Sequence, residues 1–170
     1  HEYYAGSEGN GFCYVGPHDW LTHKGTVGRA ILGEAKIVGE EGEELPPRSE
    51  GTVYFAGGAP LTYHNAPDKI AENTNKLGWT TLGDVGWLDE EGFLYLTDRK
   101  SFMIISGGVN IYPQEIENHL VTHPRVQDVA VIGGPHDEMG EEVIAVIQPV
   151  DMADAHDASR DELVGYARKK

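Results

Sequence analysis

Short runs of alternating hydrophobic and polar residues fill most of the first hundred positions of the chain. Ala35 and Ile37 alternate with polar neighbours, and Val53 and Phe55 do so again after the turn residues Glu41-Gly42. Strands that place every second side chain on one face, bounded by glycine and proline, are typical of antiparallel sheets. This part of the sequence therefore predicts a small antiparallel sheet or barrel.

Three further elements are expected in the same half. Residues 2–5 resemble a strand end that enters a small, polar loop. Residues 67–76 begin with Pro67 and predict a short helix, since proline is favoured in the first turn of a helix. Residues 78–98 predict another hairpin, with Glu91-Gly92 at its turn and apolar or aromatic residues on both sides.

The pattern changes after Asp98, where helical and strand signals begin to mix. An apolar strand, a Gly107-Gly108 turn and a second short strand are followed by a helix that starts at Pro113 and ends before Pro124. Two apolar strands then occupy residues 126–150. The last segment predicts a helix with a capping box formed by Ser159 and Glu162.

The predicted fold class is accordingly α+β: a small antiparallel β-barrel-like subdomain followed by a small, incomplete α+β domain. The boundary lies near Asp98 to Ser101, which divides the chain into residues 1–98 and 99–170. The chain begins at His1, and its last helix runs to Lys170 without a following turn. We expect a fragment of a longer protein.

Composition narrows the possible functions. The chain has 170 residues, 39% of them hydrophobic, and a formal net charge of −15. A surface this acidic repels phosphate backbones, so nucleic-acid binding is not expected. No run of about 18 apolar residues predicts a membrane span, and no basic segment with an apolar run predicts a secretion signal. Cys13 is the single cysteine, so a reducing cytoplasm is the expected location.

Three short segments carry candidate chemistry. In the first, Glu8 suits Mg²⁺, Ser7 can donate to a phosphate oxygen, and Tyr4 offers a flat face to a base. In the second, Asp84 follows a glycine at a strand end, where it can accept hydrogen bonds from both hydroxyls of a ribose. In the third, the guanidinium of Arg99 suits ribose oxygens or a phosphate. Taken singly, the first segment is explained better by an exposed polar loop and the second by an ordinary turn, and the third does not distinguish a nucleotide site from a turn.

Taken together and in this order, the segments resemble the adenylate-forming superfamily, which includes acyl-CoA synthetases, aryl-CoA ligases, beetle luciferases and peptide-synthetase adenylation domains. The matching motifs are YAGSE at residues 4–8, GTVYFAG at 51–57, WTTLGD at 79–84 and DRKSFMIISGGVNIYPQEIE at 98–117. The last motif is the most specific of them and is similar to acyl- and aryl-CoA ligases.

The resemblance implies a nucleotide site. It places Tyr4 against adenine, Ser7 on the adenylate phosphate, Glu8 on Mg²⁺, and Asp84 and Arg99 on the ribose. It also implies an activity for the parent protein, which would use ATP and Mg²⁺ to activate a carboxylic acid, most naturally a fatty acid, and pass it to CoA. The family's phosphate loop and its C-terminal catalytic lysine are not among these 170 residues, so the fragment alone is expected to be inactive.

A hinge is implied as well. Ser101 lies at the position about which the small domain turns, and Gly107 and Gly108 belong to a hairpin on the CoA side. Ser101 and Phe102 depart from the charged residues usual there, and Leu82 replaces a threonine before Gly-Asp. The departures at Ser101 and Phe102 bear on the charge-based tuning of the hinge, whereas the leucine removes a hydrogen bond near the phosphate.

Other possibilities remain open from the residues alone. An adenylation domain that loads a carrier protein, or a non-catalytic nucleotide-binding remnant, fits many of the same motifs. His119 and His123 are spaced for a zinc site on a helix, but no third ligand is evident, so a solvated helix face is the preferred interpretation. Cys13 is interpreted as a small buried hydrophobic residue rather than a nucleophile.

Overall fold

The computed structural model describes residues 1–168, which form two compact units that divide between Lys100 and Ser101 and are referred to below as unit 1 and unit 2. Both contain antiparallel sheets and few helices, which confirms the predicted α+β class. Lys169 and Lys170, predicted as the end of the last helix, lie outside the described residues. No helix within residues 1–168 is long and apolar enough to cross a membrane.

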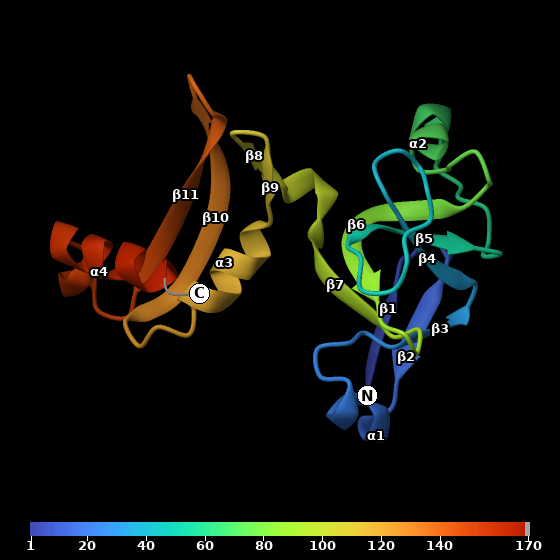
Figure 1. The fold of residues 1–170 in the computed structure, drawn as a ribbon, viewed down its shortest axis with the longest axis horizontal. Coiled ribbons are helices and arrows are strands. Elements are labelled where there is room, and N and C mark those ends of the chain that lie inside the picture. The colour runs from blue at the N-terminus through green and yellow to red at the C-terminus, as the bar shows by residue number, and fades with distance from the viewer. Residues whose placement is uncertain (169–170) are drawn as a thin grey trace. The chain divides into compact units, whose positions relative to one another are not determined.

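Unit 1 begins with a three-stranded antiparallel sheet in the order β1-β2-β3 (Figure 1). The strands are β1 (Glu2–Ala5), β2 (Phe12–Val15) and β3 (Arg29–Leu32). A short helix, α1 (Pro17–Thr22), follows β2 and was not predicted, because six residues carry too little periodicity to reveal a helix. Gly28 has φ of +104°, and a Cβ there would lie 2.1 Å from the Tyr14 carbonyl carbon, so the turn before β3 requires glycine.

A four-stranded antiparallel sheet completes unit 1, in the order β4-β5-β6-β7. Its strands are β4 (Glu34–Val38), β5 (Gly51–Ala56), β6 (Thr80–Leu88) and β7 (Leu94–Arg99), with helix α2 (Pro67–Glu72) between β5 and β6. Gly42 and Gly92 adopt positive φ in the loops joining β4 to β5 and β6 to β7, as the two predicted hairpins require.

One hydrophobic core joins the two sheets of unit 1. It consists of Cys13 from the first sheet together with Ile37, Val53, Phe55 and Leu94 from the second. A bridge between Gly28 and Leu94 links the sheets further. The described strands of unit 1 form two sheets rather than a closed barrel, with a break at Gly33 between β3 and β4.

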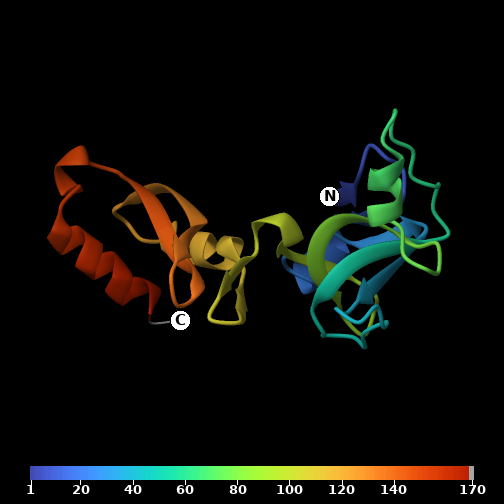
Figure 2. The same cartoon turned by 90° about the horizontal axis from the view of Figure 1, so that it is seen from above.

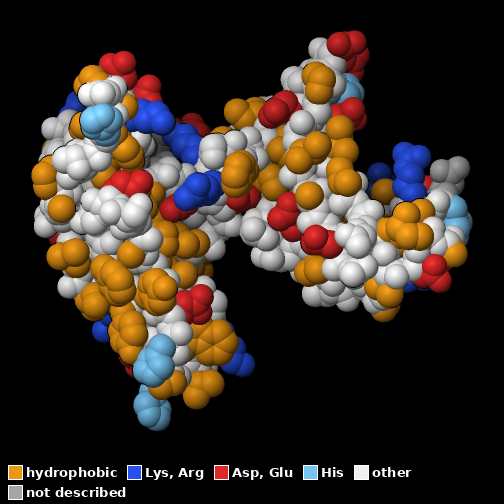
Figure 3. Space-filling model, turned by 180° about the vertical axis from the view of Figure 1, so that it is seen from behind, with side chains coloured by type: hydrophobic (Ala, Val, Ile, Leu, Met, Phe, Trp, Pro, Cys, Tyr) orange, Lys and Arg blue, Asp and Glu red, His pale blue; other side chains and the backbone are white. Residues whose placement is uncertain are grey.

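The outer face of the first sheet carries exposed hydrophobic side chains. Tyr3, Ile31 and Leu32 are 71%, 67% and 51% exposed, and Tyr3 stacks on Phe12 with ring centroids 5.8 Å apart. Figure 3 shows hydrophobic side chains gathered at the lower end of this unit.

Unit 2 contains a four-stranded antiparallel sheet in the order β10-β11-β8-β9. Its elements are the 3₁₀ turn η1 (Lys100–Phe102, whose first residue still belongs to unit 1), β8 (Ile104–Ser106), β9 (Val109–Ile111), α3 (Pro113–Leu120), β10 (Val126–His136), β11 (Gly140–Pro149), η2 (Met152–Asp154) and α4 (Asp157–Ala167). Helix α3 packs on β10 (Figure 2) and also contacts α4. The predicted start of α3 at Pro113 is confirmed.

Two predictions about the helices of unit 2 are wrong. Helix α4 starts two residues before Ser159, and its N-cap is His156, whose ring Nδ1 accepts the Ser159 backbone N–H; the predicted capping box is therefore absent. His119 and His123 do not form a solvated face. His119 stacks on Tyr166 of α4 with centroids 4.5 Å apart, and His123 is only 8% exposed.

Candidate functional site

A polar hollow of about 410 Å³ lies in unit 1. Residues from five separate stretches of the chain surround it: Tyr4, Ala5, Gly6, Ser7, Glu8, Tyr63, Asn73, Leu82, Asp84 and Arg99. All five residues predicted to bind the nucleotide or its metal are among them. The fold therefore brings together three motifs that the sequence keeps up to 95 residues apart (Tyr4 to Arg99).

The register of β6 and β7 places Asp84 directly opposite Arg99. The Arg99 Nε donates a hydrogen bond to Asp84 Oδ1 at 3.1 Å. The Asp84 side chain is 10% exposed and that of Arg99 is 58% exposed, so the carboxylate is nearly buried while its partner reaches solvent. Gly83 adopts a φ of +83°, which glycine tolerates, and its N–H donates to Thr81 Oγ1; this turn in the strand aims Asp84 into the hollow.

Tyr4 holds the other oxygen of the same carboxylate. Its hydroxyl donates to Asp84 Oδ2 at 2.5 Å, and its ring lies against Phe55 of the core, with centroids 6.1 Å apart. Burial raises the pKa of the Tyr4 hydroxyl well above its usual range, and the hydrogen bond to Asp84 raises this pKa further. The phenol is consequently a neutral donor at any physiological pH.

Glu8 lies in the loop after β1, with both carboxylate oxygens near hydroxyl donors. The Ser7 hydroxyl donates to Glu8 Oε2 at 3.3 Å, and the Tyr63 hydroxyl is 3.5 Å from Glu8 Oε1. Gly6 packs so closely on Leu82 that a Cβ would come within 2.4 Å of the leucine Cδ1. Leu82 thus supports the loop that carries Ser7 and Glu8.

Sequence reasoning missed two residues of the hollow, Tyr63 and Asn73. Tyr63 lies in the irregular segment between β5 and α2, and Asn73 caps the end of α2. Tyr63 belongs to no predicted strand or helix. Asn73 lies in the helix predicted over residues 67–76, but α2 ends at Glu72, so the helical pattern gave no sign that this amide borders the hollow.

Comparison with known proteins gives independent evidence. Residues 115–170 match the model of the AMP-binding enzyme C-terminal domain. The chain is 37% identical to a long-chain-fatty-acid–CoA ligase of Escherichia coli over 92% of its length, and 35% identical to a 2-succinylbenzoate–CoA ligase of Bacillus mycoides over 93%. These alignments cover 27% and 32% of the two relatives.

Solved structures agree. The o-succinylbenzoate CoA synthetase of Bacillus subtilis, in complex with its acyl-adenylate intermediate, matches 92% of the chain with a TM-score of 0.75 and 30% identity. ATP-bound MatB of Rhodopseudomonas palustris matches 83% of the chain with a TM-score of 0.72 and 32% identity. The chain covers 31% and 29% of these two structures. The chain belongs to the adenylate-forming, or AMP-binding, enzyme superfamily.

The chain spans about a quarter to a third of the length of the adenylate-forming relatives it matches. Its similarity to them extends over both units, since the alignments cover nine-tenths of the chain. The polar hollow of unit 1 therefore belongs to the portion that is shared with known adenylate-forming enzymes.

The remaining predicted site residues of this superfamily member lie in unit 2. Ser101 is the middle residue of η1, where the two compact units divide. Gly107 and Gly108 form the β8–β9 turn with φ of +57° and +79°, a conformation that favours two glycines. A Cβ on Gly107 would come within 2.6 Å of the Met139 Cε, and the Gly107 N–H donates to the Met139 carbonyl.

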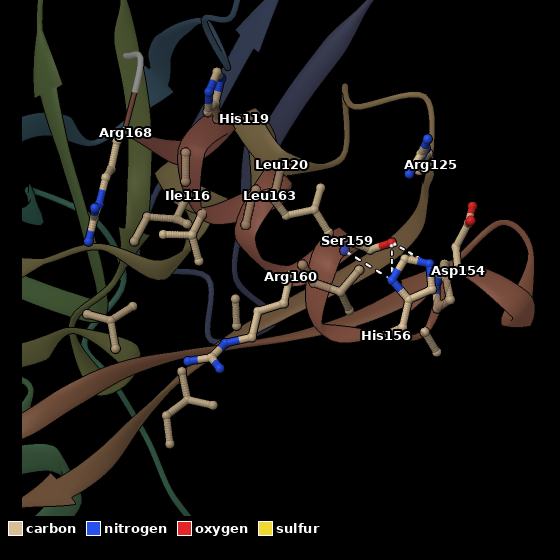
Figure 4. Close-up of a pocket in the computed structure, with 18 of the residues that line it drawn as sticks. Ile116, His119, Leu120, Arg125, Asp154, His156, Ser159, Arg160, Leu163 and Arg168 are labelled. Atoms are coloured by element: carbon tan, nitrogen blue, oxygen red, sulfur yellow. Dashed lines mark hydrogen bonds between the residues drawn. The ribbon is translucent and has the colours of Figure 1, made fainter.

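A larger hollow of about 970 Å³ lies in unit 2 among α3, β11 and α4. Figure 4 shows Ile116, Leu120 and Leu163 directed into it from the two helices. His119 also borders it, but its Nε2 lies 3.1 Å from the Tyr166 carbonyl oxygen. His123 Nε2 faces Glu162 at 3.6 Å, and no cluster of three metal-ligating side chains occurs among residues 1–168.

The unit 1 hollow offers hydrogen-bond acceptors, hydrogen-bond donors and two carboxylates, those of Asp84 and Glu8. Asp84 offers acceptors for hydroxyl groups, and Arg99 offers the remaining donors of its guanidinium. Glu8 offers the single carboxylate through which proteins commonly hold Mg²⁺ beside substrate phosphates. This donor set fits a magnesium nucleotide better than an apolar ligand.

Proposed function

We propose that the chain is part of an ATP-dependent acid–CoA ligase, which activates a carboxylic acid as its acyl-adenylate and transfers the acyl group to CoA. The observation that carries this proposal is the convergence of Tyr4, Ser7, Glu8, Asp84 and Arg99 on one polar hollow. Their order along the chain and their chemistry match the parts of a nucleotide: base, phosphate, metal and ribose.

Each residue receives a role in this proposal. Asp84 and Arg99 bind the ribose, Tyr4 lies beside the base, and Ser7 donates to the phosphate. Glu8 holds Mg²⁺, which offsets the charge on the phosphate oxygens when it is bound. Residues 1–98 form the end of a large nucleotide-binding domain and residues 99–170 the start of a small one, with Ser101 as the pivot and the Gly107-Gly108 hairpin on the CoA side.

The proposed acid is a fatty acid or another hydrophobic acid. The support is the similarity to a long-chain-fatty-acid–CoA ligase, although the 2-succinylbenzoate–CoA ligase is nearly as similar and is named for a different acid. CoA is the proposed acceptor because both of these relatives are named for it. A cytoplasmic location fits such substrates and the single cysteine.

A specific observation favours a second candidate for the acceptor. The amide bond synthetase McbA of Marinactinospora thermotolerans matches 88% of the chain with a TM-score of 0.70 and 32% identity. An acceptor other than CoA, including a carrier protein, is therefore the alternative, and it leaves the nucleotide site unchanged. Incubating the parent enzyme with ATP, acid and either acceptor, followed by mass spectrometry of the product, distinguishes the two.

Nucleotide binding by the chain tests the proposal. Titration of ¹⁵N-labelled protein with AMP is expected to shift the amide signals of residues 4–8 and 83–84. Magnesium is expected to tighten ATP binding several-fold in the wild-type chain, and Glu8→Gln removes this gain while leaving Mg²⁺-free AMP binding unchanged. Glu2→Gln, a matched change of an exposed carboxylate on β1, is the control.

Catalysis by the chain is a separate matter. We expect no exchange between pyrophosphate and ATP from the 170-residue chain with a fatty acid, because the family's phosphate loop and catalytic lysine are not among its residues. Measurable exchange would refute this expectation without affecting the nucleotide site. Absence of any AMP-induced shift near residues 4–8 or 83–84 would contradict the proposed function itself.

A further inference from the structure

We propose that the Tyr4 hydroxyl is a positioning group that orients the Asp84 carboxylate for ribose, so that the site prefers ribonucleotides to 2′-deoxyribonucleotides. This inference rests on the proposed nucleotide function and deepens it. It assigns the hydroxyl of Tyr4 a task that is separate from the contact between its ring and a base.

The hydrogen bonds of Asp84 carry the argument. Tyr4 donates to Oδ2 and Arg99 donates to Oδ1, so each carboxylate oxygen has one donor among residues 1–168. Each oxygen of an ionised carboxylate has about two lone-pair sites. One acceptor site per oxygen is left, and the vicinal hydroxyl groups of a ribose present two donors with a matching separation.

The two donors differ in how firmly they are held. Arg99 is the last residue of β7, and its side chain is 58% exposed. The Tyr4 ring, in contrast, is packed against Phe55 in the core. Tyr4 also lies within the β1–β2 ladder, paired with the fully buried Cys13. Tyr4 is therefore the fixed reference, and Arg99 alone would leave the carboxylate free to turn about its last torsion.

Removal of the hydroxyl has a selective consequence. Phenylalanine keeps the ring and its packing but leaves Oδ2 without its protein donor. A 2′-deoxyribose donates only one of the two hydroxyl hydrogen bonds to the carboxylate. The deoxynucleotide therefore loses less binding affinity than the ribonucleotide when the carboxylate is no longer oriented. A purely structural role of Tyr4 would weaken binding of both nucleotides by the same factor.

The experiment compares AMP with 2′-deoxy-AMP on three proteins: the wild-type chain, Tyr4→Phe and Tyr3→Phe. Dissociation constants come from ¹H–¹⁵N chemical-shift titrations, which reach millimolar affinities. Tyr3 precedes Tyr4 on β1 but is 71% exposed, so Tyr3→Phe is a matched control. We expect wild type and Tyr3→Phe to prefer AMP by about tenfold, the effect of one hydrogen bond to a charged acceptor, and Tyr4→Phe to prefer it less than threefold.

The outcomes are separable. The positioning role is overturned if Tyr4→Phe keeps the wild-type preference for AMP, which includes the case in which it weakens the binding of both nucleotides by the same factor. The proposed nucleotide site is unaffected by that result. If the wild-type chain binds neither nucleotide, the proposed function fails and takes this inference with it. Should Tyr4→Phe not fold, 3-fluorotyrosine placed at position 4 keeps the ring and strengthens the donor; an unchanged preference there would equally overturn the proposal.

Discussion

Of the two hollows described above, the larger one is not the one that contains the predicted site residues. The hollow of unit 2 is more than twice as large, at about 970 Å³ against 410 Å³, and it is lined mainly by aliphatic side chains such as Ile116 and Leu163. The smaller hollow of unit 1 is lined by hydroxyl groups, carboxylates and a guanidinium. Only the smaller one gathers the residues that motif order had predicted as a site.

The two hollows differ in the side chains that line them and therefore in the kinds of contact that each can offer a ligand. In unit 1, the nearly buried Asp84 carboxylate accepts hydrogen bonds from Tyr4 and Arg99 at 2.5 and 3.1 Å. Removing this carboxylate from water costs free energy, which is offset only when both donors are in position. In unit 2, the large hollow lies among α3, β11 and α4, and aliphatic side chains from these elements line it. A few convergent polar groups are thus a better guide to a binding site than volume.

The largest expected effect is a loss of stability when the hydrophobic core of unit 1 or of unit 2 is disrupted. Leu94→Ala in unit 1 and Leu120→Ala in unit 2 each remove a side chain that is at most 2% exposed. Each should lower the free energy of unfolding of its own unit by about 2–5 kcal/mol and leave the other unchanged. Urea melts followed by residue-specific NMR signals measure both, and equal loss in the two units would show that they unfold together.

Nucleotide affinity comes next. Asp84→Ala removes both acceptors for the ribose hydroxyl groups, so AMP affinity should fall on the order of 100-fold. Glu115→Ala removes a carboxylate that lines the larger hollow and should leave AMP affinity within twofold of wild type. A loss of affinity in Glu115→Ala comparable to that in Asp84→Ala would invalidate the assignment of the nucleotide to unit 1.

The raised pKa of Tyr4 predicts a dependence of stability on alkaline pH. An unfolded tyrosine ionises near pH 10, whereas folded Tyr4 stays neutral at that pH. Stability from this group is therefore complete below about pH 10 and falls above it, by up to about 1.4 kcal/mol per pH unit. Tyr4→Phe should show a shallower slope than wild type in urea melts between pH 9 and 11; parallel slopes would disprove the contribution.

The smallest effect concerns the segment where the units meet in sequence. Arg99 and Lys100 are exposed tryptic sites at the division between the units, and we expect early cleavage there. Because Arg99 contacts Asp84, AMP at twice its dissociation constant should slow this cleavage about threefold. Cleavage elsewhere, at Arg29 or Lys36 for example, serves as the internal control, and full native protection at Arg99 would argue against a hinge.

Much of the fold was predictable from local signals. The hairpins around Glu91-Gly92 and Gly107-Gly108, and the start of α3 at Pro113, follow from residues that restrict backbone torsions in known ways. The cap of α4 was missed because a histidine at position 156 replaces the residue types that usually signal a helix start.

The candidate site was predictable only in part. Motif order identified Glu8, Asp84 and Arg99, but nothing local indicated that a tyrosine hydroxyl would reach a carboxylate 80 residues away. That contact depends on how the two sheets of unit 1 pack on each other. The burial of His123 was missed for the same reason, because helix α4, which covers it, is far along the chain.

The pairing of Asp84 with Arg99 has a consequence for how this sequence can evolve. The two residues face each other because β6 and β7 are joined by a short connection, Asp89–Phe93, in which Asp89 accepts the N–H groups of Glu91 and Phe93. A single inserted or deleted residue in that connection would slide β7 by one position and turn Arg99 to the opposite face of the sheet. Natural variants should therefore tolerate substitutions at the exposed Glu90 but keep the length of this connection constant.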